Sequence, residues 1–316
     1  MDEFESIARL FRPLAAGAPE AAGLEDDAAF VTPRPGCELV ITKDGVVEGV
    51  HFLPEDPPDL VARKLLRVNL SDLAAKAAEP FGYVLGVAWP PHWGEPERTA
   101  FARGLGEDQE RYGLKLLGGD TVSTPGPMTA SVTALGYAPI GRSVRRSGAR
   151  PGDQVYVTGT IGDGWLGLMA AKGRLDRLGP SAAVLADRYR LPQPRLELRD
   201  LLAGHASACA DVSDGLASDL GHVASASRVG AVIDLDLIPL SACAEQWLAL
   251  QADRTTGLVG LITGGDDYEL VFTAPEAPPT APVPVTRIGE VVAGQGVRVI
   301  RLGEAVQLPR TGWRHG

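Results

Sequence analysis

The stretch PPDLVARKLLRVNLSDLAAKAAEP, residues 57–80, runs directly into FGYVLGVAWP, residues 81–90, and together they decide how the front half of the chain folds. From Leu60 to Leu73 the apolar residues recur at helical spacing, which predicts an amphipathic helix. Pro58 suits the first turn of that helix, where no backbone N–H is needed. The second part is a short apolar run bounded by prolines, which is typical of a strand.

The segments on either side continue this alternation of strands and helices. CELVITKD, residues 37–44, is an apolar run that turns polar at its end, as a strand leading into a site would. Residues 95–112 read as a helix, and LKLLGGDTV and TASVTALGYAP, residues 114–122 and 129–139, read as strands. The first half is therefore predicted to be an α+β domain with a mixed sheet.

A turn-like, Arg- and Gly-rich run, RSVRRSGARPGD at residues 142–153, marks a domain junction near 140–150. A chain of 316 residues exceeds the usual size of one core, so we expect two domains, 1–140 and 141–316. The second half reads as an α/β domain.

The expected elements of the second half are as follows: strand 154–159, helix 165–172 closed by Gly173, a helix after residue 211 capped by Ser213 or Asp214 and ended by Gly230, strand 231–240, and a strand–turn–strand over 258–275.

The composition of the chain limits the kinds of molecule that it can bind. The formal net charge is −10 and the isoelectric point is near 5.1, which argues against nucleic acid or an anionic membrane surface held by bulk charge. Three scattered cysteines without metal-ligand spacing, an acidic start and the lack of a long apolar run predict a soluble, cytoplasmic protein. The sequence has no Gly-Lys dipeptide, which excludes a Walker A phosphate loop, and no His-Arg-Asp motif, which excludes a protein kinase. It also lacks the H-E-x-x-H motif of zinc metalloproteases and the G-x-S-x-G motif of serine hydrolases, so both of these classes are excluded.

Carboxylates beside glycines or hydroxyls recur at the ends of the predicted elements. They are Asp26, Asp27, Asp44, Asp72, Asp120, Asp211, Asp214, Asp266 and Asp267. Any one of them also suits a turn or a helix cap. Asp72 stands out because it lies among apolar helix residues, where a carboxylate needs a metal or a partner such as Lys76. Taken together, the set predicts a site for several Mg²⁺ ions and phosphates.

At these residues the sequence resembles the thiamine-monophosphate kinase family, in the superfamily of aminoimidazole ribonucleotide synthetase, selenophosphate synthetase and the hydrogenase-maturation ATPase. The resemblance spans the whole chain. Its landmarks, in the family's order, are DDAAF, TKDGVVEGVHF, VNLSDLAAKAAEP, GGDT, RRSGARPGD, YVTGTIGDG, DVSDGLASDLGH, GGDDYELVF and the closing TGW.

The resemblance implies a PurM-like, two-domain architecture. Residues 1–140 would form a metal- and ATP-binding, dimer-forming domain, and 141–316 an α/β domain. Its magnesium ligands fall on Asp27, Thr42, Asp44, Asp72, Asp120, Asp211 and Asp214. The family often has a second hydroxyl residue where Lys43 stands, and an ammonium has no acceptor for a metal.

Other matching positions concern the nucleotide and the substrate. Gly119, Asp120, Arg146 and Ser213 match ATP contacts, with Asp211 and Arg146 in catalytic roles. Arg145 is an equal candidate for the phosphate contact. His51, Asp266 and Trp313 match substrate positions, where the family usually has Glu in place of Asp266. By themselves, His51 and Trp313 could equally be packing residues.

The implied activity is Mg²⁺-dependent direct transfer of the ATP γ-phosphoryl group to thiamine monophosphate by a homodimer. Three alternatives stay open: another ATP-using member of the superfamily, of the ribonucleotide synthetase type; a metal-dependent phosphohydrolase; and a non-catalytic metal- or nucleotide-binding module.

Overall fold

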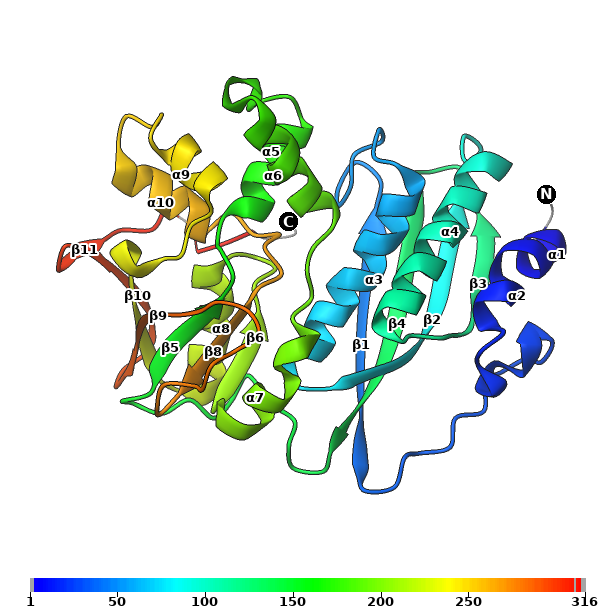
Figure 1. Cartoon of the computed structure of the whole chain (residues 1–316), viewed down its shortest axis with the longest axis horizontal. Helices are drawn as coiled ribbons and strands as arrows, with labels where there is room; N and C mark the ends of the chain where they lie inside the picture. Colours follow the sequence, from blue (N-terminus) through cyan, green and yellow to red (C-terminus); the bar gives the residue numbers. More distant parts are fainter. Residues whose placement is uncertain (1–2, 310, 314–316) are drawn as a thin grey trace. The chain divides into compact units, whose positions relative to one another are not determined.

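The computed structural model describes residues 3–309 and 311–313, and the chain divides into two compact units. The first unit comprises residues 1–73 and 78–141, and the second comprises residues 74–77 and 142–316. Figure 1 labels the helices and strands of both units. No helix among the described residues is long and apolar enough to cross a membrane.

The first unit contains a four-stranded mixed sheet with two long helices, α3 and α4, against one face (Figure 1). The strand order is β1-β4-β2-β3; β2 and β3 are parallel, and the other pairs are antiparallel. The elements are α1 (Glu3–Ser6), a π-helical turn (Ile7–Phe11), α2 (Arg12–Ala15), a 3-10 segment (Pro19–Leu24), β1 (Cys37–Val47), α3 (Pro58–Ala75), β2 (Glu79–Trp89), α4 (Glu95–Tyr112), β3 (Leu116–Ser123) and β4 (Thr129–Pro139).

Helix α3 forms where the apolar spacing predicted it. Leu65, Leu70 and Leu73 are almost completely buried, and each such side chain contributes about 1.5–3 kcal/mol through burial. A fully buried ion pair joins the helix to α4: Arg67 donates to the carboxylate of Asp108 over 2.7 and 3.0 Å. The helices are thereby fixed in one register beneath the sheet.

The second unit is built on a seven-stranded sheet of order β11-β10-β7-β9-β5-β8-β6. Only β7 and β10 pair in parallel among its described strand pairs, so the sheet is mixed and mainly antiparallel. The elements are β5 (Gln154–Thr158), α5 (Asp163–Ala171), a 3-10 turn (Asp176–Leu178), α6 (Pro180–Arg190), a 3-10 turn (Leu196–Leu198), α7 (Arg199–His205), β6 (Ala208–Asp211), α8 (Leu216–Ser227), β7 (Gly230–Asp234), a 3-10 turn (Leu235–Leu237), α9 (Ala242–Leu248), α10 (Arg254–Ile262), β8 (Leu270–Ala274), β9 (Val285–Val292), β10 (Gly296–Arg301) and β11 (Glu304–Val306).

Two predicted elements of this unit were wrong. The apolar run that begins at Leu258 is not a strand but the second half of α10, because Asp253 caps that helix by accepting the N–H groups of Thr255 and Thr256. The predicted strand 231–240 ends early, because the Asp234 side chain accepts the Asp236 N–H at 3.0 Å and turns the chain.

Candidate active site

In the first unit, the middle of β1 is held against α3 by polar side chains; the strand was predicted to end at Asp44 but continues to Val47. The Thr42 hydroxyl donates to Asp72 Oδ2, and Asn69 Oδ1 accepts the Asp44 N–H at 2.9 Å. Asn69 is completely buried and is itself fixed by donating to the Leu65 carbonyl at 2.9 Å. Because side chains alternate along a strand, Thr42 and Asp44 project from the same face of β1. One hydroxyl and two carboxylates are thus presented from neighbouring positions.

The simpler explanation of Asp72, a salt bridge to Lys76, is not what the structure has. Lys76 Nζ instead donates to the Cys209 carbonyl at 2.9 Å, while Asp72 is half-buried and accepts from Thr42. The carboxylate on an otherwise apolar helix face therefore accepts a hydrogen bond from the middle of β1 and not one from Lys76 of its own helix.

A second group of predicted ligands lines a cavity of about 640 Å³ in the same unit. Asp27 and Asp120 lie on its wall together with Gly119 and Lys43, whose ammonium donates to the Ser131 hydroxyl at 3.1 Å. Lys43 lies on the opposite face of β1 from its two neighbours in the sequence. The cavity consequently combines carboxylates with one fixed positive charge.

Gly119 has a steric reason to be glycine. A Cβ at this position would lie 2.0 Å from the carbonyl oxygen of Leu85 on the neighbouring strand. Gly119 and Asp120 lie inside β3, so the sequence motif forms part of a strand, and the close approach to β2 explains why position 119 carries no side chain.

His51 lies in the turn after β1, and its ring is oriented by the backbone. Nδ1 accepts the Val47 N–H at 3.1 Å, so the neutral ring carries its proton on Nε2. The same turn is held by Glu48, whose carboxylate accepts the Met128 N–H at 3.2 Å. Glu48 had no role in the sequence interpretation; here it supports the turn that carries His51.

In the second unit, Asp211 ends β6 at 5% exposure, and the segment to Gly215 leads into α8. The expected capping of α8 by Ser213 or Asp214 was wrong: neither side chain caps it. Instead, Asp219 from inside the helix accepts the N–H groups of Asp214 and Gly215 at 3.0 and 3.1 Å. The helix ends at Ser227 and is followed by Arg228 in a left-handed conformation, two residues before the expected Gly230.

Asp219 is one residue near the candidate site that sequence reasoning missed. Burial, with the nearby Asp214 carboxylate, raises the pKa of Asp219 to about 7, and its carboxylate gathers with those of Asp214 and the ring of His222 within 4.8 Å. The sequence did contain a signal, because Asp219 lies on the apolar face between Leu216 and Leu220. That is the argument that singled out Asp72.

Two distant segments flank the Ser213–Asp214 backbone. The Asp266 N–H donates to the Ser213 carbonyl at 2.8 Å, and the Trp313 N–H donates to the Asp214 carbonyl at 2.9 Å. Trp313 is half exposed, and the Gly312 before it has no room for a side chain, since a Cβ would lie 2.6 Å from the Asp214 carbonyl. Four of the predicted residues of this unit, Ser213, Asp214, Asp266 and Trp313, therefore lie next to one another.

Arg146 lies beside this locus with an exposed side chain, and its positive charge is close enough to lower the pKa of Asp219. Its carbonyl accepts from the Ser227 hydroxyl at 3.2 Å. Arg145 is also exposed, and its carbonyl accepts the Cys209 N–H at 2.9 Å. Both candidates for the phosphate contact are thus exposed on the segment that precedes β5.

Comparison with known proteins identifies the domains. Residues 25–138 match the AIR synthase related protein N-terminal domain, and residues 150–301 match its C-terminal domain. A thiamine-monophosphate kinase of Caulobacter vibrioides is 51% identical over 322 residues, covering 99% of this chain and 91% of that protein. The enzyme of the same name from Escherichia coli K12 is 40% identical, covering 99% of this chain and 98% of that protein.

Solved structures agree with this assignment. The crystal structure of thiamine-monophosphate kinase from Stenotrophomonas maltophilia K279a has a TM-score of 0.82 at 36% identity and covers 97% of this chain and 98% of its own. A structure described as AaThiL complexed with AMPPCP and TMP has a TM-score of 0.82 at 30% identity, covering 92% of this chain and 91% of its own. The predicted PurM-like fold is confirmed, and the chain belongs to the thiamine-monophosphate kinase family of AIR synthase related proteins.

Proposed function

We propose that the chain transfers the γ-phosphoryl group of ATP directly to the phosphate of thiamine monophosphate. An oxygen of the acceptor phosphate attacks the γ-phosphorus, the bond to the β,γ-bridging oxygen breaks, and thiamine diphosphate and ADP leave. The observation that carries the proposal is the shared locus in the second unit, where the backbone of Ser213 and Asp214 bonds to the segments of both Asp266 and Trp313. A relative is described in complex with AMPPCP and TMP, which supports the same pair of ligands.

The donor set fits Mg²⁺. The predicted ligands are carboxylate and hydroxyl oxygens, which hard divalent cations prefer. They are Asp27, Thr42, Asp44, Asp72, Asp120, Asp211 and Asp214. The bound ions would neutralise phosphate charge and align donor with acceptor. The net charge of −10 agrees with this proposal, because a strongly acidic protein needs local cations to bind two phosphorylated ligands.

The chain's own residues would bind and orient the substrates. We assign Gly119, Asp120, Arg146 and Ser213 to the nucleotide. His51, Asp266 and Trp313 would hold the thiamine end, where Asp266 offers a carboxylate to a cationic or amino group and Trp313 an exposed ring. The acceptor phosphate is already anionic at neutral pH, so no strong general base is required, and positioning supplies most of the rate.

We further propose that the enzyme acts as a homodimer in the cytoplasm. Large apolar side chains are exposed on the strands of the first unit's sheet: Leu39 and Ile41 on β1, Val84 on β2 and Val122 on β3. Leu39 and Ile41 share the β1 face that carries Lys43 and not the face toward α3. An exposed apolar sheet surface of this kind is typical of an interface. Ile41→Asp should shift the protein toward a monomer in sedimentation experiments.

The activity is tested by incubating purified protein with ATP, Mg²⁺ and thiamine monophosphate and measuring thiamine diphosphate and ADP by mass. Asp44→Asn and Asp211→Asn should each lower kcat by at least about 100-fold without changing the melting temperature much, because only metal affinity is removed. Asp200→Asn is the matched control, since the Asp200 side chain is 92% exposed. Near-normal turnover in both site variants would retire the metal assignment.

The alternatives predict other products. A phosphohydrolase would release inorganic phosphate from ATP without thiamine monophosphate. A synthetase of the ribonucleotide type would form no thiamine diphosphate, and would form aminoimidazole ribonucleotide only in a second assay that supplies its own ribonucleotide substrate. A binding module would bind ATP without turnover.

A further inference from the structure

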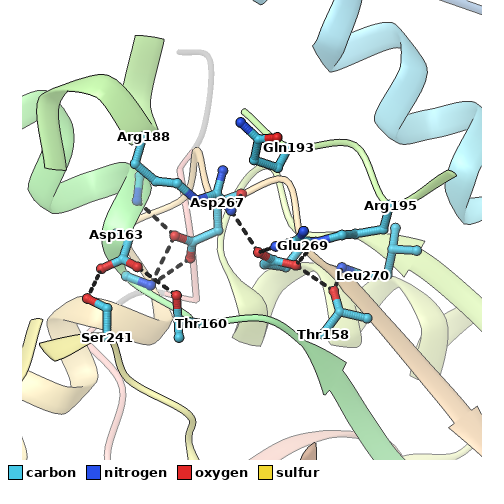
Figure 2. A network of polar contacts seen from close by, with 12 residues as sticks. Thr158, Thr160, Asp163, Arg188, Gln193, Arg195, Ser241, Asp267, Glu269 and Leu270 are labelled. Atoms are coloured by element: carbon cyan, nitrogen blue, oxygen red, sulfur yellow. Dashed lines mark hydrogen bonds and ion pairs between the residues drawn. The ribbon is translucent and has the colours of Figure 1, made fainter. Parts of the chain in front are cut away.

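A completely buried carboxylate, Glu269, lies between two arginines just after the loop that carries Asp266. Arg188 Nη2 donates to Glu269 Oε1 at 2.7 Å, and Arg195 reaches both carboxylate oxygens, with Nε at 2.7 Å from Oε2 (Figure 2). The Thr158 hydroxyl also donates to Oε2, at 2.6 Å. Both oxygens of the Glu269 carboxylate are thus fully occupied by hydrogen bonds, which hold the side chain in one place just before β8.

The neighbouring Asp267 anchors the same loop on its other side. Its carboxylate, also buried, accepts the Gly162 N–H at 2.8 Å and the Gly164 N–H at 2.9 Å, both at the start of α5 (Figure 2). Arg188 joins the two anchors, because the Nη2 that bonds Glu269 also donates to the Asp267 carbonyl at 2.9 Å. Asp266 therefore lies immediately before two clamped residues.

The loop needs such support because its backbone is strained. Gly265, Asp266 and Tyr268 all have positive φ, at +81°, +61° and +50°. Positive φ is unfavourable for residues with a side chain and persists only when the surroundings enforce it. On the other side, the N–H groups of Asp266 and Tyr268 bond to the carbonyls of Ser213 and Val212 at 2.8 Å.

Buried ion pairs of this type add little to stability, because the cost of desolvating the charges offsets their attraction. What charge-assisted, bidentate hydrogen bonds do provide is fixed geometry. A network that joins two arginines and two carboxyl groups to one strained loop is therefore better explained by the position of that loop than by the stability of the unit.

We propose that Arg188 and Arg195, acting through Glu269 and Asp267, are positioning residues that set the place of the Asp266 carboxylate against the thiamine end of the substrate. This inference rests on the proposed function, in which Asp266 contacts that end. The arginines themselves need not touch the substrate. Their loss should therefore affect binding of thiamine monophosphate more than binding of ATP.

The sharpest test compares two substitutions at one position. Arg188→Met removes the hydrogen bonds that Arg188 donates to Glu269 and to the Asp267 carbonyl, while keeping an unbranched chain. It should raise the KM for thiamine monophosphate about 10- to 100-fold, since a displacement of the loop on the order of 1 Å can cost that much. The KM for ATP should change less than about 3-fold. Arg188→Lys should bring the KM for thiamine monophosphate most of the way back to its wild-type value. Both hydrogen bonds come from Nη2 alone, and Nη1 has no partner in the described residues, so one ammonium group can replace the guanidinium.

Arg195 provides a contrasting case. It uses Nε and Nη2 together on the two oxygens of Glu269, a fork that an ammonium cannot reproduce. Arg195→Lys should therefore fail to restore the thiamine-phosphate KM, whereas Arg188→Lys succeeds. Arg103→Met, which changes a surface arginine of the first unit, is the matched control and should leave both KM values unchanged.

A double substitution separates positioning of Asp266 from a general loss of structure. In an Asp266→Ala background, Arg188→Met should add less than about 2-fold to the thiamine-phosphate KM, because the group to be positioned is gone. A full additional effect would overturn the inference, as would equal changes in both KM values or an unchanged KM with only a lowered melting temperature. If Arg188→Met does not fold, the same comparisons are made with Arg188→Gln, which keeps a donor.

Failure of the proposed function would look different. Wild-type protein would then form no thiamine diphosphate at all, whatever the variants do. An active wild type whose Arg188 variants keep the wild-type ratio of the two KM values would leave the function standing and reject the positioning role.

Discussion

A single added methyl group should displace the loop that carries Asp266. Gly164 is the second residue of α5, and a Cβ there would lie 2.1 Å from the Asp266 carbonyl oxygen, 2.2 Å from its carbonyl carbon and 2.8 Å from the Asp267 nitrogen. All three are backbone atoms, so no side chain can rotate away. Comfortable contacts between heavy atoms begin at about 3.5 Å. In Gly164→Ala the loop or the helix must therefore shift by about 1 Å.

A shift of this size predicts a kinetic effect. Misplacement by about 1 Å can cost on the order of 100-fold in rate, and we expect kcat/KM for thiamine monophosphate to fall by about that factor in Gly164→Ala. The KM for ATP should change much less. The assay is steady-state formation of thiamine diphosphate with each substrate varied in turn, alongside a melting curve to establish that the variant is folded.

Gly204→Ala is the matched control, because it makes the same chemical change in α7, where an added Cβ meets no atom within 4 Å. That variant should keep wild-type kinetics and gain up to about 1 kcal/mol of stability, since alanine favours the helix over glycine. A folded Gly164→Ala enzyme with wild-type kinetics for thiamine monophosphate would refute the reasoning, because the Asp266 loop would then have moved without consequence.

Three further substitutions test other parts of the molecule. Trp313→Ala should raise the KM for thiamine monophosphate more than that for ATP, with little change in melting temperature because the side chain is half exposed; equal effects on the two KM values would count against stacking. Asp108→Ala removes the carboxylate that faces the buried guanidinium of Arg67 and should lower the free energy of unfolding in urea by about 3–5 kcal/mol, so a loss below about 1 kcal/mol would contradict the assignment. Asp267→Asn tests the pKa of Asp267, which burial raises to about 8. Because the folded protein holds this proton between about pH 4 and pH 8 and the unfolded chain does not, the stabilising contribution is fully present below about pH 4 and is lost as the pH rises through 8, at about 1.4 kcal/mol per pH unit. The Asp267→Asn variant should lack this slope. If the wild type and the variant show the same dependence of the free energy of unfolding on pH, the raised pKa is wrong, because the Gly162 and Gly164 N–H groups then keep the Asp267 carboxyl ionised throughout.

The elements of the first unit could be predicted closely because their sequence patterns are long and consistent. The helix expected at 95–112 coincides with α4, and the one begun by Pro58 runs through four turns of α3 and beyond. The segment from Leu258 failed for the opposite reason. Five apolar residues fit a buried strand as well as a helix, and the deciding feature, the Asp253 cap, lies outside the run.

Individual residues of the candidate site could be predicted from the sequence, but their arrangement in space could not. Sequence reasoning identified Asp72, and the structure supplies the reason for its position, the Thr42 hydroxyl on the neighbouring strand. It missed Glu269, because a glutamate among apolar residues at the start of a strand gives no sign of the two arginines that meet it. Those arginines come from positions 188 and 195, more than seventy residues earlier in the chain.

The departure at Lys43 from the family's hydroxyl can now be assigned a physical consequence. Strand alternation places Lys43 across β1 from Thr42 and Asp44, so its ammonium lies in the cavity with Asp27 and Asp120 and not among the oxygens near α3. The substitution therefore leaves the Thr42, Asp44 and Asp72 oxygens in place. What it changes is the charge of the cavity, where a fixed cation now accompanies carboxylates that we assign to Mg²⁺. An ammonium repels a nearby metal ion and attracts a phosphate, so its effect should fall on the balance between metal and nucleotide in that cavity and not on the Thr42, Asp44 and Asp72 oxygens near α3.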